Sequence, residues 1–172
     1  MPTCLIGLGS NLADRAATLE AAVSDLAQSP AIEFIGRSRW HETPPVGGPA
    51  GQGAFLNGVA RIETTLPAEE LLALLASIEQ AHGRQRLVRW AARSLDLDLL
   101  LYGTLCLRTP ALEVPHPRML SRRFVMEPAA EIGGELMHPV AGLALAQLAA
   151  SLARVPPYLA ITAVRRADAQ AM

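Results

Sequence analysis

The stretch Leu95-Asp96-Leu97-Asp98-Leu99-Leu100-Leu101-Tyr102 decides the fold that we expect for this chain. Leucine and aspartate alternate over its first five residues, which is the period of a β-strand with one apolar and one polar face. The strand ends before Gly103. It is the last strand of a pattern that starts near the N-terminus, and it determines the class of fold together with the elements before it.

The segments that precede this strand follow strand and helix patterns in turn. Strands are expected over residues 3–8, 32–40 and 54–64, and helices over residues 14–28 and 66–83. The resulting order β-α-β-β-α-β is the split βαβ arrangement of ferredoxin-like sheets. We therefore expect an α+β fold with a ferredoxin-like core.

Further elements are expected after this core. A short strand follows Gly103, helical patterns cover residues 124–132 and 143–154, and residues 157–172 form a tail without a clear pattern. With 172 residues and a hydrophobic share of 51%, the chain has the size of one domain. We expect a single domain over residues 1–172 with extra C-terminal helices.

The composition limits the kinds of function. The formal net charge is -1 and the pI is near 6.4, so bulk charge does not support nucleic-acid or membrane binding. All fifteen cationic residues are arginine, which excludes a Schiff-base lysine and the lysine of a P-loop. Cys4 and Cys106 lack the spacing of a zinc site and suit a reducing compartment. Because the sequence contains no signal-peptide or membrane-span pattern, we expect a cytoplasmic protein.

Asp96 and Asp98 are the first candidates for chemistry. The strand period places both carboxylates on one face, roughly 6.6 Å apart along the strand axis. Two neighbouring carboxylates repel each other unless a cation or proton lies between them, and Mg²⁺ binds one or two carboxylates together with waters and substrate phosphates. For an isolated Asp-x-Asp pair, the solvated face of an amphipathic strand is the more common explanation.

An arginine-rich segment before the aspartates favours a phosphate site. Arg84, Arg89 and Arg93 are among four arginines in residues 80–95, which contain no acidic residue. Phosphoryl-transfer enzymes use Mg²⁺ to bridge phosphate oxygens and arginine to hold the charge that develops. Trp90 could stack on a base or a guanidinium group. The alternative explanation is a solvated basic loop.

A second basic cluster follows the proline-rich turn at residues 114–117. It comprises His116, Arg118, Arg122 and Arg123, again without an acidic residue. These side chains could close on the same phosphates. For His116 alone, a structural histidine held between two prolines is the more common explanation. The other three histidines lack the spacing of metal ligands, and we assign them no role.

Phe55 and Asn57 are a candidate site for a flat ring. They lie on the same face of the strand expected over residues 54–64, after a loop rich in proline and glycine. An aromatic plane beside an amide suits a heterocycle with a donor and acceptor edge. For the two residues alone, a core phenylalanine followed by a turn-forming asparagine is the more common explanation.

Taken together, these residues resemble the 6-hydroxymethyl-7,8-dihydropterin pyrophosphokinase family of folate biosynthesis. The matching segments run in the family's order over about residues 3–135, and the Arg-x-x-Asp-x-Asp element is the most specific of them. The segments are Leu8-Gly9-Ser10-Asn11-Leu12, Glu42-Thr43-Pro44-Pro45-Val46-Gly47, Phe55-Leu56-Asn57, Ile78-Glu79 with Gly83-Arg84, Arg89-Trp90 with Arg93-Ser94-Leu95-Asp96-Leu97-Asp98, Val114-Pro115-His116, and Arg122 with Phe124.

The resemblance implies transfer of pyrophosphate from ATP to a pterin. In that reaction the hydroxymethyl oxygen of the pterin attacks the β-phosphorus in line, and AMP leaves. The implied catalytic residues are Arg84, Arg93, Asp96 and Asp98, with two Mg²⁺ ions on the two aspartates. ATP is the co-substrate, and its implied binding residues are Glu79, Arg84, Arg89, Trp90, Arg93, Leu99, His116 and Arg122.

The resemblance also implies a pterin ring stacked between Phe55 and Phe124, with its edge read by Asn57. The complete implied pterin site is Asn11, Thr43, Pro44, Pro45, Val46, Phe55, Asn57 and Phe124. The pterin and ATP would be the small-molecule partners. We expect no nucleic-acid partner, no membrane partner and a monomeric enzyme.

The chain departs from the family pattern beside the aspartates. The family usually has Gly-Pro where this chain has Ala91-Ala92, and the loop between Arg84 and Trp90 is one residue shorter. Two other functions stay open at this point. One is a homologue that acts on a different pterin or alcohol. The other is a non-catalytic ferredoxin-like binding module, for example for RNA, which the aromatic content of 4% disfavours.

Overall fold

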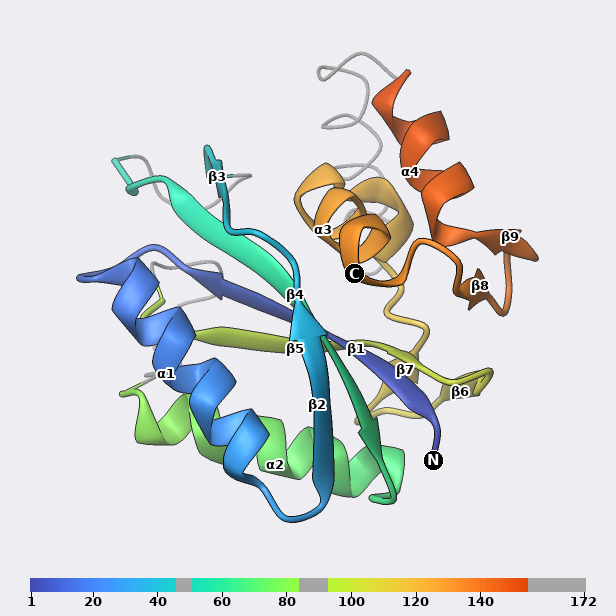
Figure 1. The fold of residues 1–172 in the computed structure, drawn as a ribbon. Helices are drawn as coiled ribbons and strands as arrows, with labels where there is room; N and C mark the ends of the chain where they lie inside the picture. Colours follow the sequence, from blue (N-terminus) through green and yellow to red (C-terminus); the bar gives the residue numbers. More distant parts are fainter. Residues whose placement is uncertain (46–50, 84–92, 155–172) are drawn as a thin grey trace.

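The computed structural model describes residues 1–45, 51–83 and 93–154 (Figure 1). Its centre is an antiparallel sheet with the strand order β2-β4-β1-β5, in which β3 also pairs with one end of β4. The strands of this sheet are β1 (Thr3–Ser10), β2 (Ile32–Arg37), β3 (His41–Thr43), β4 (Phe55–Thr64) and β5 (Asp96–Tyr102).

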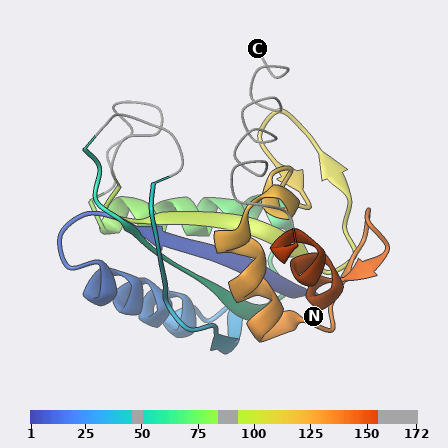
Figure 2. The same cartoon turned by 90° about the horizontal axis from the view of Figure 1, so that it is seen from above.

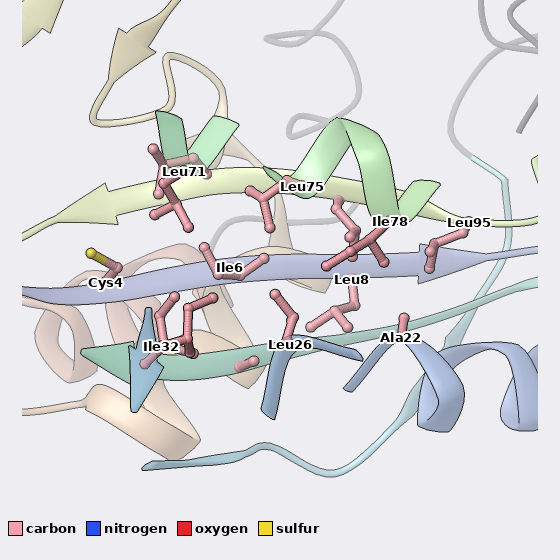
Figure 3. Packing of buried hydrophobic residues seen from close by; sticks show 14 of the residues in the cluster. Cys4, Ile6, Leu8, Ala22, Leu26, Ile32, Leu71, Leu75, Ile78 and Leu95 are labelled. Atoms are coloured by element: carbon pink, nitrogen blue, oxygen red, sulfur yellow. The ribbon is translucent and has the colours of Figure 1, made fainter. Parts of the chain in front are cut away.

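Two helices cover one face of the sheet and enclose the larger core. α1 (Arg15–Gln28) and α2 (Ala68–Ala81) each bury an apolar stripe against the strands. Figure 3 shows Leu26 of α1 and Leu75 of α2 on either side of Ile6, which is fully buried. The cap residues explain where α1 begins, because the Asp14 carboxylate accepts a hydrogen bond from the Ala17 N–H.

The opposite face of the sheet carries a second core. α3 (Arg123–Gly133) and α4 (Leu145–Ala153) lie side by side in both views, in orange and red (Figures 1 and 2). Met126 of α3 and Leu145 of α4 are fully buried with Leu5 and Val59 of the sheet. The remaining short elements are β6 (Leu107–Arg108), β7 (Glu113–Val114), a 3-10 helix (Met119–Ser121), β8 (Met137–His138) and β9 (Leu143–Ala144).

The sequence predicts an α+β fold, and this class is confirmed in that the structure combines an antiparallel sheet with α-helices on both of its faces. The prediction of a single strand over residues 32–40 is wrong, because β2 ends at Arg37 and β3 begins at His41. The break has a packing cause. The Trp40 ring packs directly over Gly58, where an added Cβ atom would lie 2.5 Å from the ring. The hydroxyl of Ser38, a side-chain group, accepts the hydrogen bond of the Val59 N–H.

The C-terminal helix expected over residues 143–154 is shorter in the structure. Leu143 and Ala144 pair with β8, and α4 begins only at Leu145. The tail expected over residues 157–172 lies outside the described residues. Among the helices that the structure describes, none has the length and apolar character needed to cross a membrane.

Candidate active site

The Asp96–Asp98 pair lies on β5, which borders the sheet next to β1. Leu97 and Leu99 point into the core and are 4% and 3% exposed, whereas both aspartates are half-buried on the other face. Asp96 is paired with Gly9 of β1 and Asp98 with Gly7. The carboxylates therefore rise from one face beside residues that have no side chain.

Gly9 separates the carboxylates from the amide of Asn57. Its neighbours across the sheet are Asp96 on one side and Asn57 on the other. A Cβ atom on Gly9 would lie 3.1 Å from Oδ1 of Asn57 and 4.0 Å from Cβ of Asp96. Glycine at this position therefore allows the Asn57 amide to lie close to β1, between the two predicted halves of the site.

Arg93 is held beside Asp96 by two groups. Its guanidinium Nη1 donates to Oδ2 of Asp96 at 2.6 Å, which forms an ion pair. Its backbone is held by Asn11, because Oδ1 of Asn11 accepts the Arg93 N–H at 2.7 Å and the Asn11 N–H donates to the Arg93 carbonyl at 3.1 Å. Asn11 is 6% exposed, and its Nδ2 also donates to Gln52. Asn11 thus joins two segments that are far apart in the sequence.

Glu79 binds the backbone of β5, the strand that carries the two aspartates. It lies on α2 with 2% of its surface exposed, and its Oε1 accepts the backbone N–H of Leu97 at 2.7 Å. A buried carboxylate needs hydrogen-bond donors, and this one receives a donor from the residue between the two aspartates. Its assignment to ATP binding stays a prediction.

The predicted pterin residues surround the junction of β3 and β4. Phe55 is paired with Thr43, and Nδ2 of Asn57 donates to Oγ1 of Thr43 at 2.8 Å. Asn57 is 7% exposed, while Phe55 is half-buried. Pro44 and Pro45 continue directly from β3, with Pro44 exposed and Pro45 half-buried.

Phe124, the predicted second stacking residue, lies in the first turn of α3. Its ring packs against the second core, and the guanidinium carbon of Arg122 lies 5.6 Å from the ring centroid. This distance is within the range of a cation–π contact. Arg122 and Phe124 are therefore side by side at the helix start, on the face of the sheet that carries Asp96.

His116 follows β7 and is held by its backbone. Its N–H donates to the Leu100 carbonyl at 2.9 Å, and its Nδ1 accepts the Arg118 N–H at 3.1 Å. Burial lowers the pKa of His116 from 6.5 to about 4, with further lowering by the charges of Arg122 and Arg118. The ring is therefore neutral at pH 7, and because Nδ1 accepts a hydrogen bond, the ring proton sits on Nε2.

The remaining predicted site residues are Leu99 and four residues outside the described part of the chain. Leu99 is buried in the core of α1 and α2 rather than on the face of the aspartates. Val46, Arg84, Arg89 and Trp90 lie outside the described residues, as do Ala91 and Ala92.

Two residues beside the site, Gln52 and Arg15, were not predicted from the sequence. Gln52 receives the amide of Asn11, and Arg15 binds both Glu42 and the Ala54 carbonyl. Only the start of a helix at residue 14 hints at Arg15 in the sequence. Gln52 gives no signal, because its partner is 41 residues away.

The donor set at β5 suits a hard cation that takes most of its ligands from elsewhere. In the described part of the chain, no cluster of three or more His, Cys, Asp or Glu side chains could enclose a metal ion. Both carboxylates are partly exposed, and their partners on β1, Gly9 and Gly7, carry no side chain. Mg²⁺ prefers this arrangement, with one or two carboxylates and several oxygens from water and phosphates.

Comparison with known proteins gives one consistent family. The model of the family 7,8-dihydro-6-hydroxymethylpterin-pyrophosphokinase (HPPK) matches residues 5–134. A Bacillus subtilis protein named 2-amino-4-hydroxy-6-hydroxymethyldihydropteridine pyrophosphokinase is 46% identical over 127 residues, which cover 74% of this chain and 75% of that protein. A Pseudomonas aeruginosa protein of the same name is 40% identical over 134 residues, covering 78% and 82%.

Solved structures agree with this family at the level of the fold. A Plasmodium falciparum HPPK-DHPS structure with pteroate superimposes with a TM-score of 0.69 at 13% sequence identity. The similarity covers 87% of this chain and 42% of that larger chain. With the family match over residues 5–134, this chain belongs to the 7,8-dihydro-6-hydroxymethylpterin-pyrophosphokinase family.

Proposed function

We infer that this chain transfers pyrophosphate from ATP to the hydroxymethyl group of 6-hydroxymethyl-7,8-dihydropterin, a step of folate biosynthesis, and releases AMP. The observation that carries this inference is the placement of Asp96 and Asn57 on either side of Gly9 in the sheet. Adjacent strands lie about 4.8 Å apart, so the carboxylate and the amide, which are two strands apart, stand roughly 10 Å from each other. A bicyclic ring at Asn57 could present its hydroxymethyl group to phosphates at Asp96.

The pterin would be bound by the residues at the junction of β3 and β4. Asn57 is oriented by its hydrogen bond to Thr43, which favours one position of the amide for reading the edge of a heterocycle. Phe55 and Phe124 would supply the flat apolar surfaces for stacking. Asn11 would act on this site through Gln52, which it binds.

The reaction would proceed by in-line displacement at the β-phosphorus. The hydroxymethyl oxygen forms a bond to that phosphorus and loses its proton to water, while the bond to the oxygen bridging the α- and β-phosphates breaks and AMP leaves. Arg93 and Arg122 would hold the negative charge on the phosphate oxygens. Neutral His116 would donate a hydrogen bond through Nε2.

Asp96 and Asp98 would hold the Mg²⁺ ions, two in number, that accompany ATP. When bound, Mg²⁺ neutralises phosphate charge and orients the phosphate oxygens. In the same proposal, Arg93 orients the Asp96 carboxylate through its ion pair and Glu79 fixes the strand between the aspartates.

We also propose that the core is ferredoxin-like. Support comes from the chain order β1-α1-β2-β4-α2-β5 of its main elements, with α1 and α2 packed on the same face. All neighbouring strands of this core pair in antiparallel orientation, as that arrangement requires.

The test is a product analysis of the purified protein. It is incubated with ATP, Mg²⁺ and 6-hydroxymethyl-7,8-dihydropterin, and the nucleotides are separated by chromatography. AMP in amounts equal to the pterin diphosphate supports the proposal. Formation of ADP without AMP, or AMP that appears equally without the pterin, contradicts it. Omission of Mg²⁺ tests the metal separately.

A further inference from the structure

Arg15, the first residue of α1, connects the two strand ends that carry the proposed pterin site. Its Nη1 donates to the carbonyl of Ala54 at 2.7 Å, and its Nη2 donates to Oε2 of Glu42 at 2.7 Å. Glu42 belongs to β3, and Ala54 directly precedes β4. One guanidinium group thus spans the point where the chain leaves β3 and the point where it enters β4.

These contacts lie on the side of the sheet that faces away from the proposed substrate. Glu42 is paired with Leu56, and Leu56 packs against the core of α1 and α2. Thr43, the residue after Glu42, points to the other face because side chains alternate along a strand, and there it accepts a hydrogen bond from Asn57. Arg15 therefore acts on Thr43 and Phe55 only through the backbone, since its two partners are the residues immediately before them.

The chemistry of arginine suits this position. A guanidinium group presents several N–H donors in a rigid plane, so it can bind a carboxylate and a carbonyl at the same time. An ammonium group is a point charge and does not offer this fork. β3 has three residues, and in the described part of the chain it pairs with β4 alone, with Thr43–Phe55 as the last pair of the register.

We propose that Arg15 is a positioning residue for the pterin. It holds Thr43 and Phe55 at the spacing that the ring requires, and without it the pair samples other positions, so the fraction of binding-competent protein falls. This inference rests on the proposed function, because it takes Thr43, Phe55 and Asn57 as the pterin site.

The experiment compares Arg15→Met with a matched control, Arg61→Met. Arg61 on β4 also binds one carboxylate, that of Glu135, and one backbone carbonyl, that of Ile132. The side-chain exposures of the two pairs are similar, at 30% and 60% for Arg15–Glu42 and 23% and 65% for Arg61–Glu135. Both variants lose an equivalent bridge, but only one bridge lies at β3.

We expect Arg15→Met to raise the KM for the pterin roughly tenfold and to leave the KM for ATP nearly unchanged. Direct fluorescence titration with the pterin, in the presence of a nonhydrolysable ATP analogue, should give the same loss. Arg61→Met should change neither constant. Glu42→Gln keeps an acceptor for Nη2, so it should lose less pterin affinity than Arg15→Met.

Two results overturn the inference. One is an unchanged KM for the pterin in Arg15→Met, and the other is an equal rise in Arg61→Met. If Arg15→Met does not fold, Arg15→Lys, which keeps the charge but not the fork, must show the selective rise in its place. Absence of AMP formation by the unchanged chain would instead remove the proposed function, so the two failures are distinguishable.

Discussion

Oε1 of Glu79 accepts a hydrogen bond from the backbone N–H of Leu97, 2.7 Å away. The donor belongs to the residue between Asp96 and Asp98, and the acceptor is a buried side chain of α2. In the sheet as described, β5 pairs only with β1, so its other edge carries backbone groups that no strand binds. Glu79 supplies the partner there, at the position that orients both carboxylates.

Two replacements of Glu79 should distinguish the effect of its hydrogen bond from the effect of its charge. Glu79→Ala leaves a buried Leu97 N–H without its acceptor, and we expect a loss of about 1–3 kcal/mol in the free energy of unfolding, together with a fall in kcat. Glu79→Gln retains an acceptor oxygen and should lose less of both. Urea denaturation and AMP production measure the two effects. Equal losses in the two variants would contradict a role in positioning β5.

The aspartates should be needed for the reaction and not for folding. Asp96→Asn and Asp98→Asn keep the size of the side chain but remove a charge from the half-buried face, so each should lower kcat at least roughly a hundredfold. The melting temperature should change little, because the core side of β5 consists of leucines. AMP production at saturating ATP and Mg²⁺ is the measurement.

Asp25→Asn is the control for these two variants. Asp25 lies on α1 and binds His82, away from the face that carries the aspartates of β5. Its replacement should keep kcat within about twofold of the unchanged chain. Activity above a tenth of the original in either aspartate variant would remove the assignment of Asp96 and Asp98 as metal ligands.

The alternation of Leu95 to Leu99 was sufficient to predict which face of β5 is core and which carries charge. Side-chain direction in a strand depends on a period of two, and this period is visible in the sequence itself. The helix over residues 14–28 was predictable for the same kind of reason, because its apolar residues recur at helical spacing and Asp14 stands at its start.

The relations across the site were not predictable from local patterns. Asn57 faces Gly9 because β4 and β1 pair in one register, and that register depends on the packing of the whole sheet. The break between β2 and β3 depends on Trp40 lying over Gly58, which is 18 positions further along the chain. Local β-propensity continues through such a break, so the sequence pattern predicts one strand where tertiary packing makes two.

Gly9→Ala should damage the proposed site with little effect on the fold. The new Cβ would lie 3.1 Å from Oδ1 of Asn57, so the amide must move by a few tenths of an ångström. We expect the KM for the pterin to rise roughly tenfold, because a small misplacement of a substrate costs much of its productive binding. Steady-state kinetics with the pterin as the varied substrate measure this.

Gly36→Ala is the matched control for Gly9→Ala. Gly36 lies on β2 at the other border of the sheet, and a Cβ atom there would meet Cδ1 of Ile132 at 3.4 Å, an ordinary contact with a flexible side chain. It tests the general effect of a methyl group on a strand of this sheet. A rise in KM of the same size in both variants would mean that the close contact between position 9 and Asn57 has no special role.

His116 should make the stability of the protein depend on pH in the acidic range. Its pKa is about 4 in the folded protein and near 6.5 when unfolded, because burial and the guanidinium groups of Arg122 and Arg118 disfavour the charged ring. Below pH 6.5 the unfolded chain therefore binds a proton that the folded chain excludes. The stabilisation from this group is complete above pH 6.5 and decreases as the pH falls toward 4, by up to about 3 kcal/mol.

His116→Asn tests this relation, because asparagine keeps an acceptor for the Arg118 N–H but does not titrate. The melting temperature of the unchanged chain should fall more steeply between pH 6.5 and 4 than that of the variant. His138 also has a lowered pKa owing to burial, so both proteins retain a part of the slope that comes from its titration. Only the difference between the two curves reports on His116. Parallel curves over this range would show that the ring is already accessible to protons in the folded state, and they would remove the argument that His116 is a neutral donor to phosphate.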